Sequence, residues 1–135
     1  MAGETNLTIL LQSMRPKLLD KEYIFTCIED GNYGDLAELN PIAMFQEGEG
    51  MTLVLERQSA ESAGVAIEAI FKCITLTVHS SLDAVGLTAA FSNKLAEHGI
   101  SANVIAGYYH DHIFVQTEKA EQALAALQEF SAASS

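Results

Sequence analysis

The stretch that decides the fold is FKCITLTVHSSLDAVGLTAAFSNKLAEHGISANVIAGYYHDHIFVQTEKAEQALAAL, residues 71–127. Over residues 74–78 apolar side chains alternate with threonines, which predicts a half-buried strand. From Ala84 onward apolar residues recur at steps of three and four, which predicts an amphipathic helix. We expect Asp83 to cap the start of this helix. We expect Gly99 to end it in the left-handed conformation, with the next residue folding back onto the helix.

Two further strands and a second helix follow along the chain. The strands are expected at residues 102–109 and 112–117, with His110 and Asp111 forming the tight reversal between them. The last helix is expected at residues 118–130, with acidic residues in its first turn. The resulting order of strand, helix, two strands and helix is a split βαβ unit of the ferredoxin-like type.

The upstream half offers a degraded copy of the same order. Its patterns predict a short helix, a short strand, a longer strand, a turn-rich loop, a hairpin and a modest helix, at residues 7–15, 17–19, 22–28, 29–35, 42–56 and 59–69. The loop has the acids that calcium prefers but not the spacing of an EF-hand, so no calcium site is expected there. No residue-level repeat accompanies this duplication of element order.

The residues HSSLDAVGLTAAFSNKLAEHGISANVIAGYYHDHIFV, at positions 79–115, resemble an ACT domain, the small ligand-sensing βαββαβ module attached to amino-acid biosynthetic enzymes. A glycine near the helix start, followed by HGIS and a strand, is shared widely among ACT domains. The segment GYYHDH is similar to a narrower group of small bacterial proteins, which consist of tandem ACT-like units with no enzyme attached. The resemblance implies an α+β fold of two ferredoxin-like units in tandem, with antiparallel sheets and the helices on one face.

The resemblance also implies a division into domains. Residues 1–69 would form a degenerate N-terminal ACT-like unit and residues 70–135 a C-terminal one. A complete ACT unit has a fourth strand after its second helix, whereas this sequence continues there as SAASS. The fourth strand of the C-terminal unit must therefore come from upstream or from another chain, and we expect it at about residues 51–57.

Ligands of ACT domains lie against the loop from the first strand to the first helix and against the second strand. Carried over by position, the implied ligand-binding residues are Ser80, Ser81, Asp83, Ala84, Val85, Gly86, Asn103, Val104 and Ile105. Backbone N–H groups at a helix start can hold a carboxylate, Asp83 can pair with an ammonium group, and Gly86 lets a ligand approach closely. The alternatives are that a serine or Asp83 only caps the helix and that Asn103 only finishes a turn.

Histidines and tyrosines around the hairpin form a second group, expected beside the site or at an interface: His79, Tyr108, His110 and His112. Tyr108 and Tyr109 are neighbours in the predicted strand, so one is expected in the core and the other at the surface. Two histidines flanking Asp111 suit zinc or nickel, but a reversal at this point would splay their side chains. A structural hairpin, with Asp111 holding the turn and His112 hydrogen-bonded, is favoured, and no metal or cofactor is expected.

Composition argues against several classes of partner. Seven basic and eighteen acidic residues give a net charge of −11, which repels nucleic acid and anionic membranes. No apolar run is long enough to span a membrane, and the first residues lack the basic region of a secretory signal, so a cytoplasmic location is expected. Cys27 and Cys73 both fall in predicted strands, where buried, reduced thiols are expected.

These features favour a non-catalytic regulatory protein that binds a small molecule, expected to be an amino acid. A homodimer and an unidentified regulated protein are expected as partners. No GxSxG elbow, glycine-rich phosphate loop or HExxH helix is present. The alternative hypothesis is a ligand-independent interaction module that uses an open sheet edge. A third hypothesis, a metal-dependent enzyme centred on His79, His110 and His112, requires bound metal.

Overall fold

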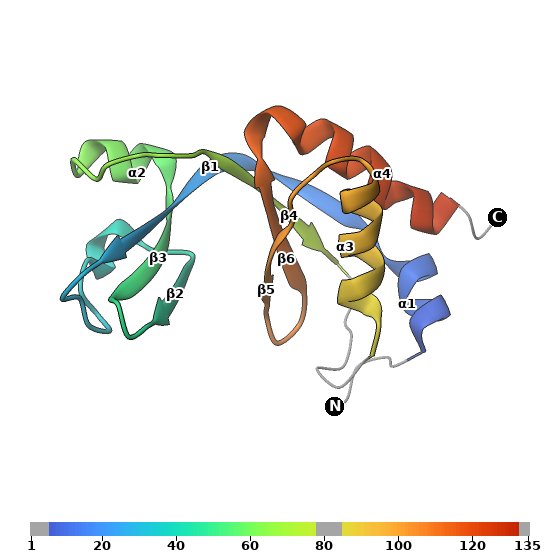
Figure 1. The fold of residues 1–135 in the computed structure, drawn as a ribbon, viewed down its shortest axis with the longest axis horizontal. Coiled ribbons are helices and arrows are strands. Elements are labelled where there is room, and N and C mark those ends of the chain that lie inside the picture. Colours follow the sequence, from blue (N-terminus) through green and yellow to red (C-terminus); the bar gives the residue numbers. More distant parts are fainter. Residues whose placement is uncertain (1–5, 78–84, 133–135) are drawn as a thin grey trace. The chain divides into compact units, whose positions relative to one another are not determined.

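The computed structural model describes residues 6–77 and 85–132, and the chain divides into two compact units (Figure 1). Unit 1 comprises residues 1–19 and 72–135, and unit 2 comprises residues 20–71. Each unit buries its own cluster of apolar side chains. The two units are therefore described separately.

Unit 1 is a sheet with helices packed on one face. Its elements are α1 (Leu7–Ser13), the start of β1 (Pro16–Ile28), β4 (Phe71–Leu76), α3 (Leu87–Glu97), β5 (Asn103–Ala106), β6 (Asp111–Gln116), η2 (Thr117–Lys119) and α4 (Ala120–Ala132). The strand order is β1-β4-β6-β5, so β6 lies between β4 and β5 as in a ferredoxin-like unit. The three α-helices contact one another (Figure 1), and Phe91 of α3 shares one core with Ile74 of β4 and Ile113 of β6. This arrangement confirms the predicted α+β fold.

The helix α3 follows directly from the apolar spacing in the sequence. Leu87, Phe91 and Leu95 recur at intervals of four and are all buried in the unit 1 core. Gly99, with φ 71°, ends the helix in the left-handed conformation. The Ile100 N–H then donates to the Leu95 carbonyl at 3.0 Å, and the buried Ile100 side chain packs in the same core. The predicted helix stop is confirmed.

The predicted start of this helix is wrong. α3 begins at Leu87 and not at Ala84, and its N-cap is Gly86 and not Asp83. Gly86 has φ 95°, and a left-handed residue cannot continue a right-handed helix. A Cβ added to Gly86 would lie 3.1 Å from Cδ2 of Leu7, so the glycine also lets α1 approach the start of α3. Asp83 and Ala84 themselves lie outside the described residues.

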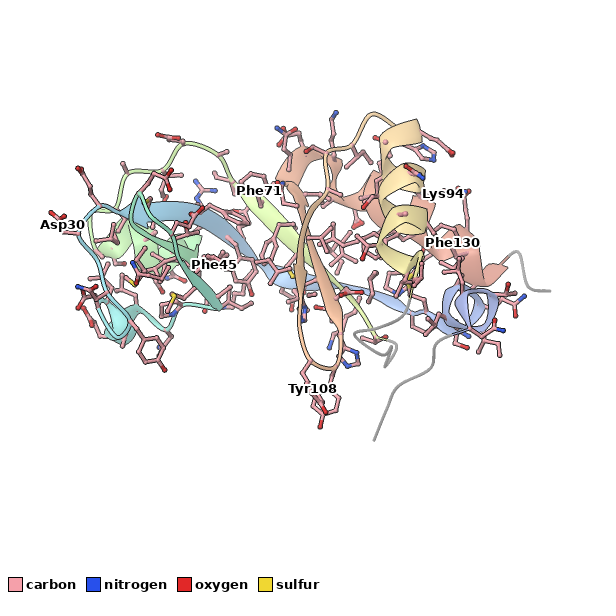
Figure 2. All side chains as sticks on the ribbon, turned by 60° about the horizontal axis from the view of Figure 1, so that its bottom comes forward. Asp30, Phe45, Phe71, Lys94, Tyr108 and Phe130 are labelled. Carbon is pink, nitrogen blue, oxygen red and sulfur yellow. The ribbon has the colours of Figure 1, made fainter. Side chains whose placement is uncertain are left out.

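The hairpin between β5 and β6 turns earlier than predicted. The Gly107 N–H donates to the His110 carbonyl at 2.9 Å, and Asp111 is already the first residue of β6, so the predicted reversal at His110 and Asp111 is wrong. Tyr108 and Tyr109 lie in the turn, where they are 64% and 61% exposed. Figure 2 shows Tyr108 projecting from the hairpin tip. The prediction that one of the two tyrosines lies in the core is therefore also wrong.

The register of this hairpin is decided by burial. Val104 of β5 pairs with Ile113 of β6; Ile113 belongs to the unit 1 core and Val104 packs against it. A shift of one residue would turn the apolar side chains of one strand to the opposite face of the sheet. The aromatic residues of the turn favour a strand by propensity, but burial of this apolar pair outweighs that preference.

β1 runs without a break through 13 residues and joins the two strands predicted at residues 17–19 and 22–28. Its first residues, up to Leu19, belong to unit 1 and lie beside β4 in the strand order. The Thr77 N–H also donates to the Arg15 carbonyl at 3.1 Å, just before β1 begins. The fourth strand of unit 1 thus comes from upstream, as expected, but β1 supplies it.

The expectation that residues 51–57 supply this strand is wrong. β3 (Met51–Glu56) instead pairs with β1 from Tyr23 to Ile28, inside unit 2. Because β1 contributes residues to both units, the compact units do not coincide with the contiguous segments 1–69 and 70–135.

Unit 2 contains fewer regular residues than unit 1. Its elements are the rest of β1, η1 (Ala37–Leu39), β2 (Ala43–Gln46), β3 and α2 (Arg57–Ser62), with strand order β2-β3-β1. The helix predicted at residues 59–69 is shorter, because Gly64 adopts φ 76° and the Val65 N–H closes back onto the Ala60 carbonyl at 2.9 Å. Between β1 and β2 the only regular element is η1, which has three residues.

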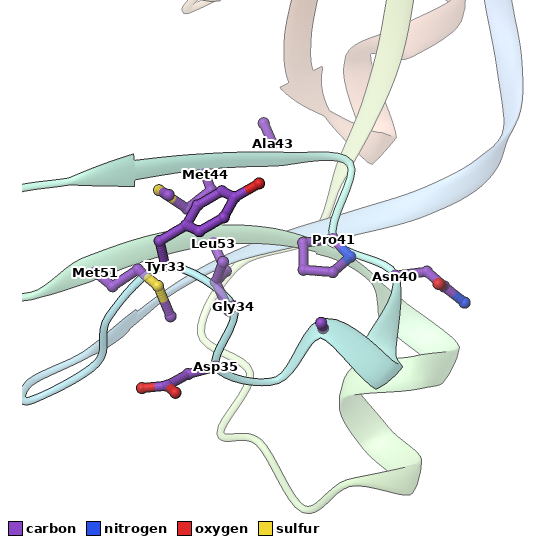
Figure 3. Close-up of a pocket in the computed structure, with 10 residues that line it drawn as sticks. Tyr33, Gly34, Asp35, Asn40, Pro41, Ala43, Met44, Met51 and Leu53 are labelled. Carbon is purple, nitrogen blue, oxygen red and sulfur yellow. The ribbon is translucent and has the colours of Figure 1, made fainter.

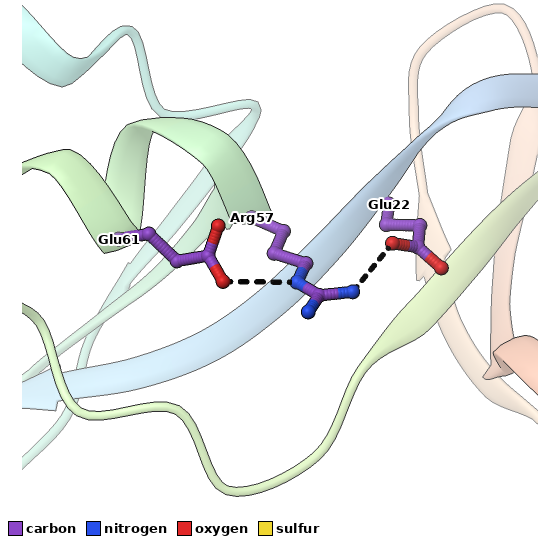
Figure 4. A network of polar contacts seen from close by, with 3 residues as sticks. All are labelled: Glu22, Arg57 and Glu61. Atoms are coloured by element: carbon purple, nitrogen blue, oxygen red, sulfur yellow. Dashed lines mark hydrogen bonds and ion pairs between the residues drawn. The ribbon is translucent and has the colours of Figure 1, made fainter.

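Arg57 joins α2 to the sheet of unit 2 (Figure 4). Its Nη1 donates to Oε1 of Glu22 on β1 at 2.9 Å, and its Nε donates to Oε2 of Glu61 on α2 at 3.2 Å. All three side chains are partly exposed, so solvent screens both ion pairs and each contributes little to stability. The orientation of this short helix is therefore supported by both packing and charge.

We predict that Gly50→Ala destabilises the protein by about 1–3 kcal/mol, whereas Gly48→Ala is nearly neutral. Gly50 has φ 154°, and an added Cβ would lie 2.7 Å from both Sγ of Cys27 and the Ile28 carbonyl oxygen. Gly48 lies in the same hairpin with nothing within 4 Å of an added Cβ. Urea unfolding of both variants measures the difference. Equal midpoints for the two variants would contradict the conformation at Gly50.

Candidate functional site

The expected ligand loop is described only at its end. His79, Ser80, Ser81, Asp83 and Ala84 lie outside the described residues. Val85 and Gly86, which follow them, immediately precede α3, and the Val85 side chain is 84% exposed. Packing alone explains the glycine at position 86, because Leu7 occupies the space where a side chain would lie.

The three expected ligand residues on β5 do not share a face of the sheet. Val104 packs against the helix-side core of unit 1, so the side chains of Asn103 and Ile105 lie on the opposite face. The Asn103 amide Nδ2 donates to the Phe114 carbonyl at 3.2 Å, across the pair of strands. The sequence suggested that Asn103 either contacts a ligand or finishes a turn. The bond to Phe114 does neither, because it links the side chain to the paired strand.

His112 lies on the same sheet face as Ile105, its partner across the hairpin. Its Nδ1 is hydrogen-bonded to Oγ1 of Thr75 on β4 at 3.0 Å, which confirms the predicted hydrogen-bonded histidine. Burial lowers the pKa of His112, with a further lowering by His110 and an opposing effect of Asp111. The other part of that prediction is wrong, because Asp111 is a strand residue and does not hold the turn.

The histidines of the hairpin do not form a metal site with other described side chains. Burial raises the pKa of the Asp111 carboxyl, while His112 and His110 lower it. Over residues 6–77 and 85–132 no group of three or more histidine, cysteine, aspartate or glutamate side chains is placed to hold a metal ion. His79, the third ligand that a metal hypothesis requires, is outside these ranges.

The two cysteines differ in their environments. Cys73 is fully buried on β4, as expected, and burial raises the pKa of its thiol to about 11, against a smaller lowering by a hydrogen bond with Thr75. Cys27 is exposed on β1, so the expectation of a buried thiol there is wrong. Both thiols are free. A buried thiol of such high pKa is a poor nucleophile, which places Cys73 among structural residues.

Unit 2 contains a pocket of about 530 Å³ that the sequence patterns did not reveal (Figure 3). It is lined by Tyr33, Gly34, Asp35, Ala37, Asn40, Pro41, Ala43, Met44, Met51 and Leu53. Residues 33–41 come from the loop that contains η1, and the others come from β2 and β3. The volume falls within the range of about 300–1,000 Å³ that is usual for small-molecule sites. The signal available in the sequence was the long, turn-rich segment between two strands, where a helix is expected.

The sequence and the fold of this chain were compared with protein family models and with solved structures. Residues 2–72 match one model of the ACT domain and residues 68–129 match another. A crystal structure from Vibrio cholerae, described as a protein of unknown function and possible transport protein, is 62% identical, with a TM-score of 0.85 over 93% of this chain and 95% of that chain. The ligand-free regulatory subunit of aspartate kinase from Thermus thermophilus is 12% identical, with a TM-score of 0.62 over 88% of this chain and 97% of that chain. Comparison with curated proteins found no match.

The chain belongs to the ACT domain family and carries two ACT domains in tandem. The resemblance read from the sequence is thereby confirmed. At 12% identity the likeness to the Thermus subunit shows the fold alone. Membership of the ACT family supports a regulatory, ligand-binding role. In the part of the chain that the structure describes, no helix is long and apolar enough to cross a membrane.

We predict that His112 makes the protein less stable as the pH falls below about 6.5. Because its pKa is lowered on folding, the unfolded state binds this proton more readily, and the free energy of unfolding falls as the pH drops from 6.5 through the lowered value. His112→Gln should flatten that part of the pH profile, measured by urea unfolding, whereas His98→Gln, an exposed histidine at the end of α3, should leave it in place. An unchanged slope in His112→Gln would contradict the assignment.

We predict that one thiol of the native protein reacts rapidly with Ellman's reagent and the other only after unfolding. The rapid reaction should be lost in Cys27→Ser and kept in Cys73→Ser, because only Cys27 is exposed and the pKa of Cys73 is raised. Two thiols that react at equal rates in the native protein would show that Cys73 is accessible.

Proposed function

We propose that this protein is a non-catalytic ACT-type sensor that binds an amino acid and reports its presence to a partner protein. The observation that carries this proposal is the completeness of unit 1. The order β4-α3-β5-β6-α4, together with the first residues of β1, supplies all the strands and helices of an ACT unit. The strand-to-helix loop and the second strand, which the family uses for ligands, therefore both have counterparts here.

The start of α3 offers groups that suit a ligand carboxylate. The first hydrogen bond of the helix runs from the Ala90 N–H to the Gly86 carbonyl at 2.9 Å. The N–H groups of Leu87, Thr88 and Ala89 come before it in the chain and have no acceptor within the helix. α3 has 11 residues, and the positive end of its dipole lies at this start. An amino-acid carboxylate would be stabilised there, and Asp83, from the preceding loop, would pair with the ammonium group.

β5 contributes to the proposed site through its backbone. It is the last strand in the order β1-β4-β6-β5, and an edge strand presents N–H and C=O groups away from its neighbour. The side chain of Val104 is committed to the core and the Asn103 amide to Phe114, so at these two positions the main chain is the part of the strand available to a ligand.

The proposed mechanism is a shift between conformations of the protein. A ligand that binds one conformation more tightly increases the population of that conformation, by no more than its differential affinity. We propose that the sensor acts as a cytoplasmic homodimer and that a regulated protein binds one of the two conformations. Such a coupling is reciprocal, so the regulated protein would also raise the affinity for the amino acid.

A second candidate function is an interaction module without a ligand, and the exposed edge strand of unit 2 favours it. β2 is the first strand in the order β2-β3-β1, and its residues Met44 and Phe45 are 36% and 70% exposed. An exposed edge with apolar side chains can pair with a strand of another chain.

Thermal unfolding of the purified chain against each standard amino acid, at millimolar concentration, tests the sensor. A ligand that binds only the folded state stabilises it by about 2.7 kcal/mol at 100 times its Kd, which raises the Tm by several degrees. We expect a rise that is selective for one amino acid or a few related ones. Asp83→Asn should abolish the rise, because it removes the charge that pairs with the ligand ammonium group.

The matched control is Glu97→Gln, which removes an exposed acid at the other end of α3 and should keep the full response. A flat panel would overturn the amino-acid sensor. The interaction module would then be supported by a dimer in light scattering that becomes a monomer in Phe45→Lys.

A further inference from the structure

The pocket of unit 2 lies where this unit lacks a helix. Between the first and second strands of unit 1 stands α3, with 11 residues, whereas the same interval of unit 2 contains only the three residues of η1. Met51 and Leu53 of β3, which belong to the unit 2 core, form part of the pocket wall. A loop, and not a helix, covers Met51 and Leu53, which are 0% and 2% exposed, and residues of this loop line the pocket with them.

The wall of the pocket is mainly apolar and adaptable. Met44, Met51, Leu53 and Pro41 present aliphatic surface, and unbranched methionines adjust readily to different ligand shapes. Tyr33, from the loop, is 86% exposed at the pocket and would lose much of that exposure against a ligand (Figure 3). Burial of apolar ligand surface here would favour binding.

The polar side chains of the pocket are the Asp35 carboxylate, the Tyr33 hydroxyl and the Asn40 amide. The backbone N–H groups of Asp35, Ala37 and Asn40 already donate to loop carbonyls, and Pro41 has none. The lining residues include one charged side chain, the carboxylate of Asp35, and no lysine, arginine or histidine. Oδ2 of Asp35 accepts a hydrogen bond from the Asn32 N–H at 2.9 Å, which holds the carboxylate in place. The one charged group of the lining would therefore repel an anionic ligand and attract a cation.

We propose that this pocket binds a small organic cation with an apolar body, of the class of primary amines attached to an aromatic or branched aliphatic group. The apolar body would lie against Met44, Met51 and Leu53, and the ammonium group would pair with Asp35. This site involves a different unit and different residues from the amino-acid site at the start of α3, so either can be present without the other. The net charge of −11 adds a long-range attraction for cations.

The methyl groups of methionine provide a direct test on the full chain. The protein has four methionines, of which Met44 and Met51 line the pocket while Met14 is buried in the unit 1 core. Protein labelled with ¹³C at the methionine methyl groups is titrated with phenethylamine and, separately, with 3-phenylpropionate, which has a similar shape and the opposite charge. We expect saturable shifts at Met44 and Met51 but not at Met14, and an affinity about tenfold weaker for the carboxylate.

Two variants separate charge recognition from general attraction to an acidic protein. Asp35→Asn keeps an acceptor oxygen for the Asn32 N–H but removes the charge, and should bring the two affinities close together. Glu38→Gln removes an exposed acid from η1 that does not line the pocket, and should keep the discrimination. A Tm near that of the unchanged protein verifies folding of both variants.

Three results would overturn the proposal: no shift at Met44 and Met51 at the highest soluble amine concentration, shifts of equal size at Met14, or equal affinities of the unchanged protein for amine and carboxylate. These results need no variant. They are also independent of the amino-acid response, which depends on Asp83 and is measured by thermal unfolding.

Discussion

Both cores of the protein depend on one strand, β1. Leu18, near its start, packs against the unit 1 core, and Ile24, in its middle, is fully buried in the unit 2 core. At about 3.3 Å per residue a strand of 13 residues extends on the order of 40 Å, enough to enter two cores in turn. A segment that begins at residue 70 would leave β4 without the neighbour that β1 provides, and its backbone groups would lose their partners. The compact unit is for this reason discontinuous in sequence.

The reliable part of the sequence prediction is the part that periodicity controls. The apolar spacing of Phe91 and Leu95, followed by Gly99, placed α3 and its end correctly, because burial and the left-handed stop both act locally. The start of α3 was missed because Asp83 and Gly86 are both acceptable N-terminal residues, and only the packing of Leu7 beside Gly86 distinguishes them. The hairpin was misplaced for a similar reason, since its register depends on the pairing of two strands and not on the propensity of either.

The candidate site was predicted less well than the fold, and part of the reason was available in advance. Asn103, Val104 and Ile105 are consecutive strand residues, and a period of two never puts three such side chains on one face. A family resemblance transfers the strand but does not say whether side chain or main chain makes the contact. The sequence predicted that His112 is hydrogen-bonded but did not predict its partner, Thr75. The partner lies 37 residues away, on a strand whose alignment with β6 the sequence does not specify.

The two ACT units of this chain are not equivalent, and the difference is concentrated between their first and second strands. In unit 1 a helix of 11 residues fills that interval and buries Phe91 and Leu95. In unit 2 a turn-rich loop fills it with less apolar surface, and Leu36 and Leu39 reach the core only as partly buried residues. Leu36 and Asn40 both adopt positive φ, at 60° and 53°, on either side of η1. Backbone strain of this kind costs about 1–3 kcal/mol per residue and persists only where the surroundings impose it.

The loop of unit 2 is therefore better understood as a shaped segment than as a helix that failed to form. Its N–H groups are largely satisfied by bonds within the loop, such as Asp35 to Asn32 and Asn40 to Ala37, so the segment holds its form without the regular bonds of a helix. The loop covers Met51 and Leu53 in place of a helix, and these two residues form part of the wall of a cavity that the loop also lines. The degraded sequence pattern of the N-terminal half and the pocket of unit 2 thus have one physical origin. A helix in one unit and a constrained loop in the other thus give two different surfaces to the same interval between the first and second strands.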